Sequence, residues 1–258
     1  MIPIFKSHYS IGKSILTLEP SSKEPNKNGS DSIFQLCKDN NIQRVYLVED
    51  SFGGALEAFE NAKESNVELR FGWQVSCVSN VENKDDEEWE TSHKLIIFCD
   101  SYKSYSNLVK LYTIANTEFA CNGKARVDLN FLKNEWRDDF FLAIPFYDSF
   151  IYRNIMEKGR CIFNKITNNI VACTENNDMP FDYLIRKNIE QYCLSNGIET
   201  IEAKSIYYKD RKDFNAFTVY KCMNRKTFGS GNSLDKPNID HFGSEEFCFE
   251  SFLENQKR

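Results

Sequence analysis

Short apolar runs rich in β-forming residues alternate with segments of helical periodicity along all 258 residues of the chain. The runs predict strands at 2–5, 44–48, 67–71, 94–99, 140–144, 170–173 and 200–203. The intervening segments predict helices at 31–40, 54–65, 104–116, 148–158, 180–196, 212–225 and 245–254. Alternation of this kind is typical of βα units. The sequence therefore predicts an α/β fold with a mainly parallel sheet, either open or closed into a barrel.

The composition fits one folded domain over residues 1–258. Hydrophobic residues make up 41% of the chain, and 11 Gly and 6 Pro are too few for a disordered or collagen-like protein. We find no linker or shift in composition that would mark a second domain. Two polar stretches, near 20–30 and 83–90, are predicted as surface excursions from the fold.

Several classes of protein are disfavoured by simple patterns. The chain has no apolar run of about 18 residues and no signal-peptide pattern at its start, which predicts a soluble, cytoplasmic protein. Its 9 cysteines contain no C-x-x-C pair, which favours free thiols in a reducing compartment over a zinc ribbon. A net charge of −6 argues against a protein that holds nucleic acid unaided.

A set of short motifs occurs in a characteristic order. The motifs are FKSHYS (5–10), VED (48–50), GALE (54–57), FGWQV (71–75), HKLII (93–97), YSNLVKL (105–111), RVD (126–128), IYY (206–208) and SEEF (244–247). In this order they resemble the PHP (polymerase and histidinol phosphatase) domain found at the N-terminus of the bacterial DNA polymerase III alpha subunit. The resemblance implies a distorted (β/α)7 barrel whose site lies at the C-terminal ends of the strands. No polymerase palm is present in the chain.

The resemblance also implies that the site is degenerate. Active members of the family hold up to three metal ions on His, Asp, Glu and Cys ligands and activate water against a phosphoester. This chain has 3 histidines in total, too few for such a site. The family's ligand positions fall instead on residues of other types: Ile4, Lys6, Lys13, Gln74, Tyr147, Ser205 and Tyr207. We therefore expect no catalytic residues and no metal cofactor.

Three residues keep ligand chemistry: Glu49, Asp50 and His93. The family's Asp-His pair falls on Val48-Glu49 or on Glu49-Asp50, depending on where a short gap is placed. The ammonium groups of nearby lysines would repel a metal and pair with Glu49 or Asp50. His93 also fits a hydrogen-bonded, partly buried side chain at the start of a strand.

Three lysines allow a second interpretation of the ancestral pocket. Lys6, Lys13 and Lys204 are candidates for an anion site at the ancestral pocket, although solvated lysines are the ordinary alternative.

Two functional hypotheses follow from the resemblance. The first is a structural or docking module in DNA replication, whose partner is a replicative polymerase catalytic chain or its proofreading exonuclease. Such a module would contact DNA only indirectly, and no membrane is involved. The polymerase palm would come from a partner or from the rest of a longer protein. The Lys-, Asn- and Phe-rich composition suits a bacteriophage with a split polymerase. The alternative is a metal-dependent 3′–5′ exonuclease or phosphoesterase that uses Glu49, Asp50 and His93 with Mn, Zn or Mg.

Overall fold

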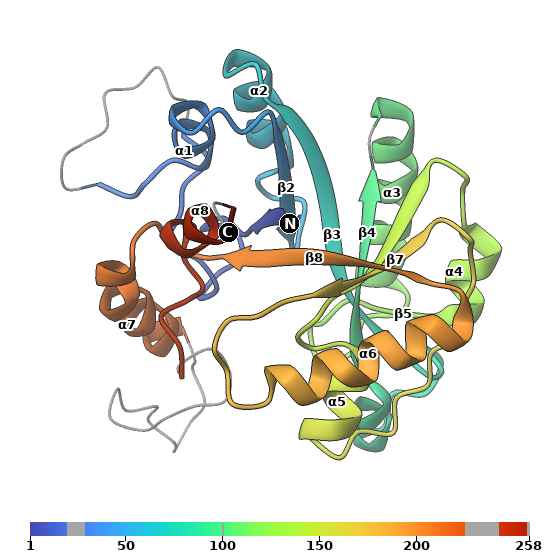
Figure 1. The fold of residues 1–258 in the computed structure, drawn as a ribbon. Helices are drawn as coiled ribbons and strands as arrows, with labels where there is room; N and C mark the ends of the chain where they lie inside the picture. Colours follow the sequence, from blue (N-terminus) through green and yellow to red (C-terminus); the bar gives the residue numbers. More distant parts are fainter. Residues whose placement is uncertain (20–28, 100, 225–242, 257–258) are drawn as a thin grey trace. The chain divides into compact units, whose positions relative to one another are not determined.

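The computed structural model describes residues 1–19, 29–99, 101–224 and 243–256 (Figure 1). Its strands are β1 (Ile2–Phe5), β2 (Arg44–Glu49), β3 (Glu68–Val78), β4 (His93–Cys99), β5 (Arg126–Asp128), β6 (Phe140–Ile144), β7 (Ile170–Thr174) and β8 (Glu199–Ile206). Its helices are α1 (Ile33–Asp39), α2 (Ala55–Glu64), α3 (Tyr102–Thr117), α4 (Leu129–Glu135), α5 (Phe150–Met156), α6 (Asp182–Asn196), α7 (Phe214–Asn224) and α8 (Phe249–Gln256), with short 3-10 turns η1 (Asp86–Thr91) and η2 (Arg211–Asp213).

The strands form a closed barrel. Their order is β2-β1-β8-β7-β6-β4-β3-β5, and a further pairing of β2 with β3 joins seven of the 8 strands into a ring. β5 pairs with β3 outside that ring. The pairs β1–β2, β1–β8, β6–β7 and β7–β8 are parallel, whereas β4 runs antiparallel to β6. The structure is thus a mixed α/β barrel with helices between strands, as the alternation predicted in outline.

The predicted strands correspond to β1, β2, β3, β4, β6, β7 and β8. Two elements were not predicted, the short strand β5 and the helix α4 that follows it directly. The excursion near 20–30 lies almost wholly outside the described residues. None of the helices in the described ranges has the length and hydropathy that a bilayer-spanning segment needs.

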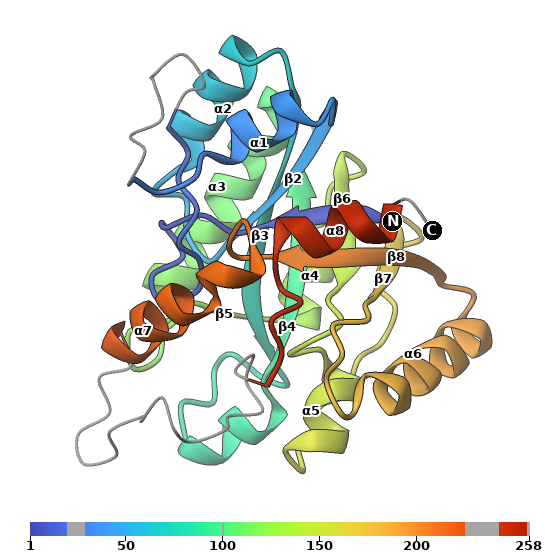
Figure 2. The same cartoon turned by 60° about the vertical axis from the view of Figure 1, so that its left-hand side comes forward.

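The chain divides into two compact units. The first unit comprises Met1–Phe71, Asn176–Asp182 and Ala203–Arg258, and the second comprises Gly72–Glu175 and Tyr183–Glu202. Within the first unit α8 lies against β1, where the rings of Phe249 and Phe5 are 6.0 Å apart (Figure 2). Within the second unit α3 packs on β3 through an edge-on contact of Tyr112 with Trp73. The expectation of one domain stays a prediction.

Local sequence explains where the helices begin and end. α1 starts after Ser32, whose hydroxyl accepts the Gln35 amide, and α3 starts with a reciprocal capping box between Ser101 and Ser104. α6 ends before Gly197, which has a φ of +58°. Glycine adopts this left-handed conformation without strain, so Gly197 is suited to end α6.

The excursion near 83–90 is attached to the second unit by a fully buried cation. The Arg126 side chain donates to the carbonyls of Val81, Asn83 and Phe119 at 2.9 to 3.0 Å. Its guanidinium also lies 5.8 Å from the centre of the Trp89 ring. A buried charge needs such partners in place of water. Although its rim is exposed, the excursion is therefore an ordered part of the second unit.

Candidate functional site

The C-terminal ends of three parallel strands of the first unit carry the predicted positions. In register, Ile4 of β1 lies beside Tyr46 of β2 and beside Ser205 of β8. Because side chains alternate between the two faces of a strand, Ile4, Lys6 and Asp50 share one face with Ser205 and Tyr207. Five predicted positions therefore meet at one end of the first unit.

Asp50 is neutralised by two lysines at this end of the unit. The Lys6 Nζ donates to Asp50 Oδ1 at 3.3 Å and to the Val48 carbonyl at 3.2 Å. The Lys13 Nζ lies 2.9 Å from Asp50 Oδ2. Burial lowers the pKa of Lys6, an effect that the Asp50 charge opposes. The expected pairing of these lysines with a neighbouring acid is confirmed, and both oxygens of Asp50 are engaged.

Glu49 lies on the opposite face of β2 from Asp50 and binds serines instead of lysines. It is fully buried and accepts hydrogen bonds from the Ser7 amide, at 2.7 Å, and from the Ser10 hydroxyl. Burial raises the pKa of Glu49, while Lys6 and the two serines act against that rise. Glu49 thus fastens the turn that follows β1 to the end of β2, and this turn carries Lys13.

Aromatic rings fill the space around Tyr207. Its ring is stacked between Phe217 of α7 and Phe247, with centroid distances of 5.8 and 5.6 Å. The Tyr207 carbonyl accepts the Ser14 hydroxyl and the Ile15 amide, at 2.9 and 3.0 Å. Tyr207 is therefore a packed side chain of structural character.

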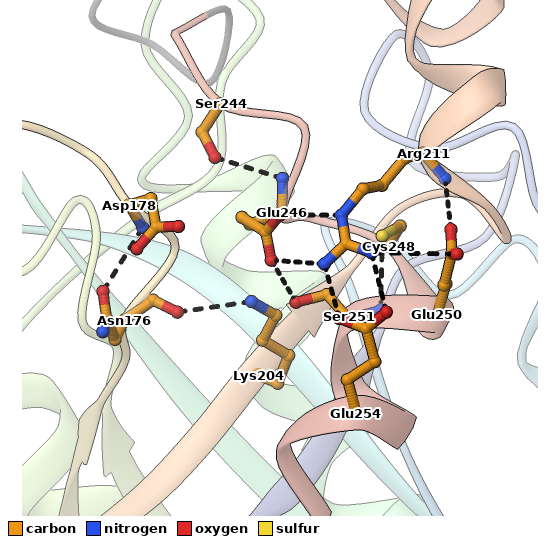
Figure 3. Close-up of polar contacts among 10 residues, drawn as sticks. All are labelled: Asn176, Asp178, Lys204, Arg211, Ser244, Glu246, Cys248, Glu250, Ser251 and Glu254. Carbon is orange, nitrogen blue, oxygen red and sulfur yellow. Dashed lines mark hydrogen bonds and ion pairs between the residues drawn. The ribbon is translucent and has the colours of Figure 1, made fainter.

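Lys204 does not join the other two lysines. It lies next to Ser205 on β8, so its side chain is on the opposite face from Lys6. There it is 1% exposed and donates to the Asn176 carbonyl at 3.2 Å (Figure 3). The structure thus brings Lys6 and Lys13 together and separates Lys204 from them, which leaves the three without a common anion pocket.

His93 belongs to the second unit, as do Gln74 and Tyr147. Its Nδ1 is 3.4 Å from the Thr91 carbonyl, and the rings of Phe150 and Phe163 lie edge-on at 6.0 and 6.3 Å. Burial lowers the pKa of His93 to about 4. Its Nε2 is buried and has no hydrogen-bond partner among the described residues. His93 is therefore a neutral side chain in an aromatic cage at the start of β4, in agreement with the structural interpretation of this residue.

The other two positions of the second unit are also packed. Gln74 on β3 is 8% exposed, and in the described part of the chain its Oε1 has no hydrogen-bond partner. Tyr147 follows β6 and contacts Phe146 and Tyr152 edge-on, at 4.9 and 5.9 Å. Within the described ranges no group of three or more His, Cys, Asp or Glu side chains is placed to hold a metal ion.

Sequence reasoning missed the serines that hold Glu49. Ser7 and Ser10 are both buried, and although both lie in the FKSHYS motif, nothing in that motif marked them as partners of Glu49. A signal was present only in their spacing after β1, where Ser10 donates its backbone amide to the Ser7 carbonyl and closes a turn.

Comparison with known proteins does not identify the chain. A scan against models of protein families gives no match, and a search of curated proteins by sequence gives none either.

Proposed function

We propose that this chain is a PHP-like (β/α)7 barrel that has lost catalysis and acts in DNA replication as a docking module. Its partner is a replicative DNA polymerase catalytic chain of the polymerase III alpha type, or the proofreading exonuclease that works with it. The motif order supports the family, and the chemistry at the strand ends supports the loss of activity.

The observation that carries the proposal is the pairing of Asp50 with both Lys6 and Lys13. A divalent cation at Asp50 would have to displace two ammonium groups that lie within 3.3 Å of its oxygens. The adjacent carboxylate in the sequence, Glu49, faces the opposite side of β2 and accepts hydrogen bonds from Ser7 and Ser10. Hydrolysis by metal-activated water needs converging anionic ligands and an open coordination position. The arrangement favours a structural role instead.

A direct binding measurement tests the docking role. The purified chain is mixed with the purified polymerase catalytic chain, and separately with the exonuclease, of the organism that encodes it, and each mixture is followed by sedimentation velocity. We expect a stoichiometric complex with one of the two that survives moderate salt and nuclease treatment. If neither protein binds, the proposed partner is wrong.

An activity measurement tests the loss of catalysis. The chain is incubated with single-stranded DNA and with a phosphomonoester in the presence of Mn²⁺, Zn²⁺ or Mg²⁺. We expect no turnover, and a melting temperature that a strong chelator leaves unchanged, since a metal that organised the fold would add stability. Metal-dependent release of nucleotides that is lost in a folded His93→Ala variant would establish the nuclease alternative.

A further inference from the structure

Residues Ser244–Gln256, here called the strap, belong to the first unit, come after α7 in the sequence and include α8. Three backbone hydrogen bonds join the strap to the segment after β8. The Tyr207 amide donates to the Phe247 carbonyl at 3.0 Å, and the Phe249 and Glu250 amides donate to the Tyr208 and Lys209 carbonyls at 3.0 and 2.9 Å. Protection of the Tyr207, Phe249 and Glu250 amides therefore reports whether the strap is docked.

The inner side of the strap is aromatic. Phe247, Phe249 and Phe252 are each 2% exposed or less. Phe249 lies against Phe5 of β1, and Phe247 stacks on Tyr207 with an angle of 11° between the rings. Docking of the strap thus covers aromatic surface of the first unit.

The outer side of the strap is held by one residue, Arg211 of η2 (Figure 3). Its guanidinium donates to both oxygens of Glu246, at 2.8 and 3.1 Å, and to both oxygens of Glu254, at 3.0 and 2.8 Å. The Arg211 backbone amide donates to Glu250 at 2.9 Å. Two forked pairs on a single guanidinium are strong and geometrically specific contacts.

The three carboxylates depend on that guanidinium. Glu250 and Glu254 are four residues apart on α8, and Glu246 meets them at the same guanidinium, so without this cation the three carboxylates repel one another. Hydrogen bonding to Arg211 is the main cause that lowers the pKa of Glu246. The Arg211, Glu246, Glu250 and Glu254 side chains are 21% to 50% exposed, which leaves the contact open to solvent ions. Loss of Arg211 therefore replaces attraction by repulsion.

We propose that the strap is a detachable element of the first unit, clasped by Arg211, that opens as one piece while β1 and β2 stay folded and thereby uncovers Tyr207 and Phe5. This device is independent of the proposed role in replication. It gives the first unit two states that differ in exposed aromatic surface.

Amide hydrogen exchange of the full chain under native conditions tests the device. The variant is Arg211→Gln, and the matched control is Arg44→Gln, which removes another arginine of the first unit whose ion pair with Glu68 is exposed. In Arg211→Gln we expect the Tyr207, Phe249 and Glu250 amides to exchange together, about tenfold faster or more, with unchanged exchange in β1 and β2. In Arg44→Gln the strap amides should exchange as in the wild type.

Two results would contradict the proposal that the strap detaches. The first is an equal acceleration of the strap amides and of β1 and β2, because the strap then opens only with the whole unit. The second is unchanged exchange of the strap amides. If Arg211→Gln does not fold, Glu254→Gln removes one of the two forked pairs and Glu68→Gln is its matched control, with the same pattern expected at smaller amplitude.

Discussion

The Lys6 ammonium lies 3.3 Å from one carboxylate oxygen of Asp50, and solvent reaches 8% of the lysine side chain. A buried cation is tolerated only with partners, and Lys6 has this carboxylate and the Val48 carbonyl. The stability of the end of β1 therefore depends on Asp50 more than on Lys6.

Asp50→Asn should lower the free energy of unfolding by about 2 kcal/mol, because the buried Lys6 charge loses its paired carboxylate. The double variant Lys6→Met/Asp50→Asn should regain most of that loss, since the buried ammonium is gone and the Lys13 side chain, 41% exposed, is solvated. Urea denaturation measures both. Asp31→Asn is the control, because Asp31 pairs with a half-exposed Lys209 and should cost about 0–1 kcal/mol. A double variant no more stable than Asp50→Asn contradicts the prediction.

His93→Phe should make the free energy of unfolding fall less steeply as the pH is lowered. Burial lowers the pKa of His93 from 6.5 to about 4, so the folded state resists protonation. The neutral His93 contributes fully to the free energy of unfolding above pH 6.5. This contribution is lost as pH falls toward about 4, because the unfolded chain binds a proton first. The wild type should lose about 3 kcal/mol more than the variant over that range. Urea titrations at several pH values measure this, and a variant that loses as much unfolding free energy at acid pH as the wild type contradicts the prediction.

Tyr208→Phe should leave stability unchanged or raise it by about 1 kcal/mol. The Tyr208 hydroxyl is fully buried, and among the described residues the Phe247 backbone approaches it without the geometry of a hydrogen bond. Tyr9→Phe is the matched comparison, because it removes a hydroxyl that donates to Glu57 at 2.7 Å, and it should cost about 1 kcal/mol. Thermal and urea unfolding report both, and a loss in Tyr208→Phe as large as that in Tyr9→Phe would reveal a partner for the hydroxyl.

Gly72→Ala should destabilise the second unit by about 2 kcal/mol through overpacking. A Cβ at Gly72 would lie 2.6 Å from the Phe98 ring and 2.9 Å from an Ile96 methyl. At Gly53 the nearest atom would be 3.5 Å away, so Gly53→Ala should change stability by less than about 0.5 kcal/mol. Equal melting temperatures of the two variants would show that Phe98 moves aside at little cost.

Periodicity sufficed for the elements with a clear apolar face. Ala55, Ala58 and Ala62 recur at helical spacing and are the buried side of α2. It failed for β3, predicted to end at Phe71, because Gly72 reads as a break although the strand continues to Val78. β5 was missed because three residues carry no period, and α4 because its cap, Asp128, is also the last residue of that strand.

The sequence predicted which kinds of side chain pair at the candidate site, but not which acid the lysines contact. The sequence indicated that Lys6 and Lys13 would pair with Glu49 or Asp50, and the structure selects Asp50. The choice depends on the phase of side-chain alternation along β2, and a shift of one residue exchanges the two acids between faces. The same alternation places Lys204 away from Lys6, which no count of lysines can reveal.

The bonds of Arg126 to the carbonyls of Val81, Asn83 and Phe119 tie two stretches of chain to a single position. A deletion that trims the excursion would remove the Asn83 carbonyl and the Trp89 ring from the buried Arg126 charge, and a neutral residue at 126 would leave three carbonyls without their donor. Either change alone is expected to destabilise the second unit. Residue 126 and the excursion are therefore expected to be gained and lost as a pair in the history of this lineage.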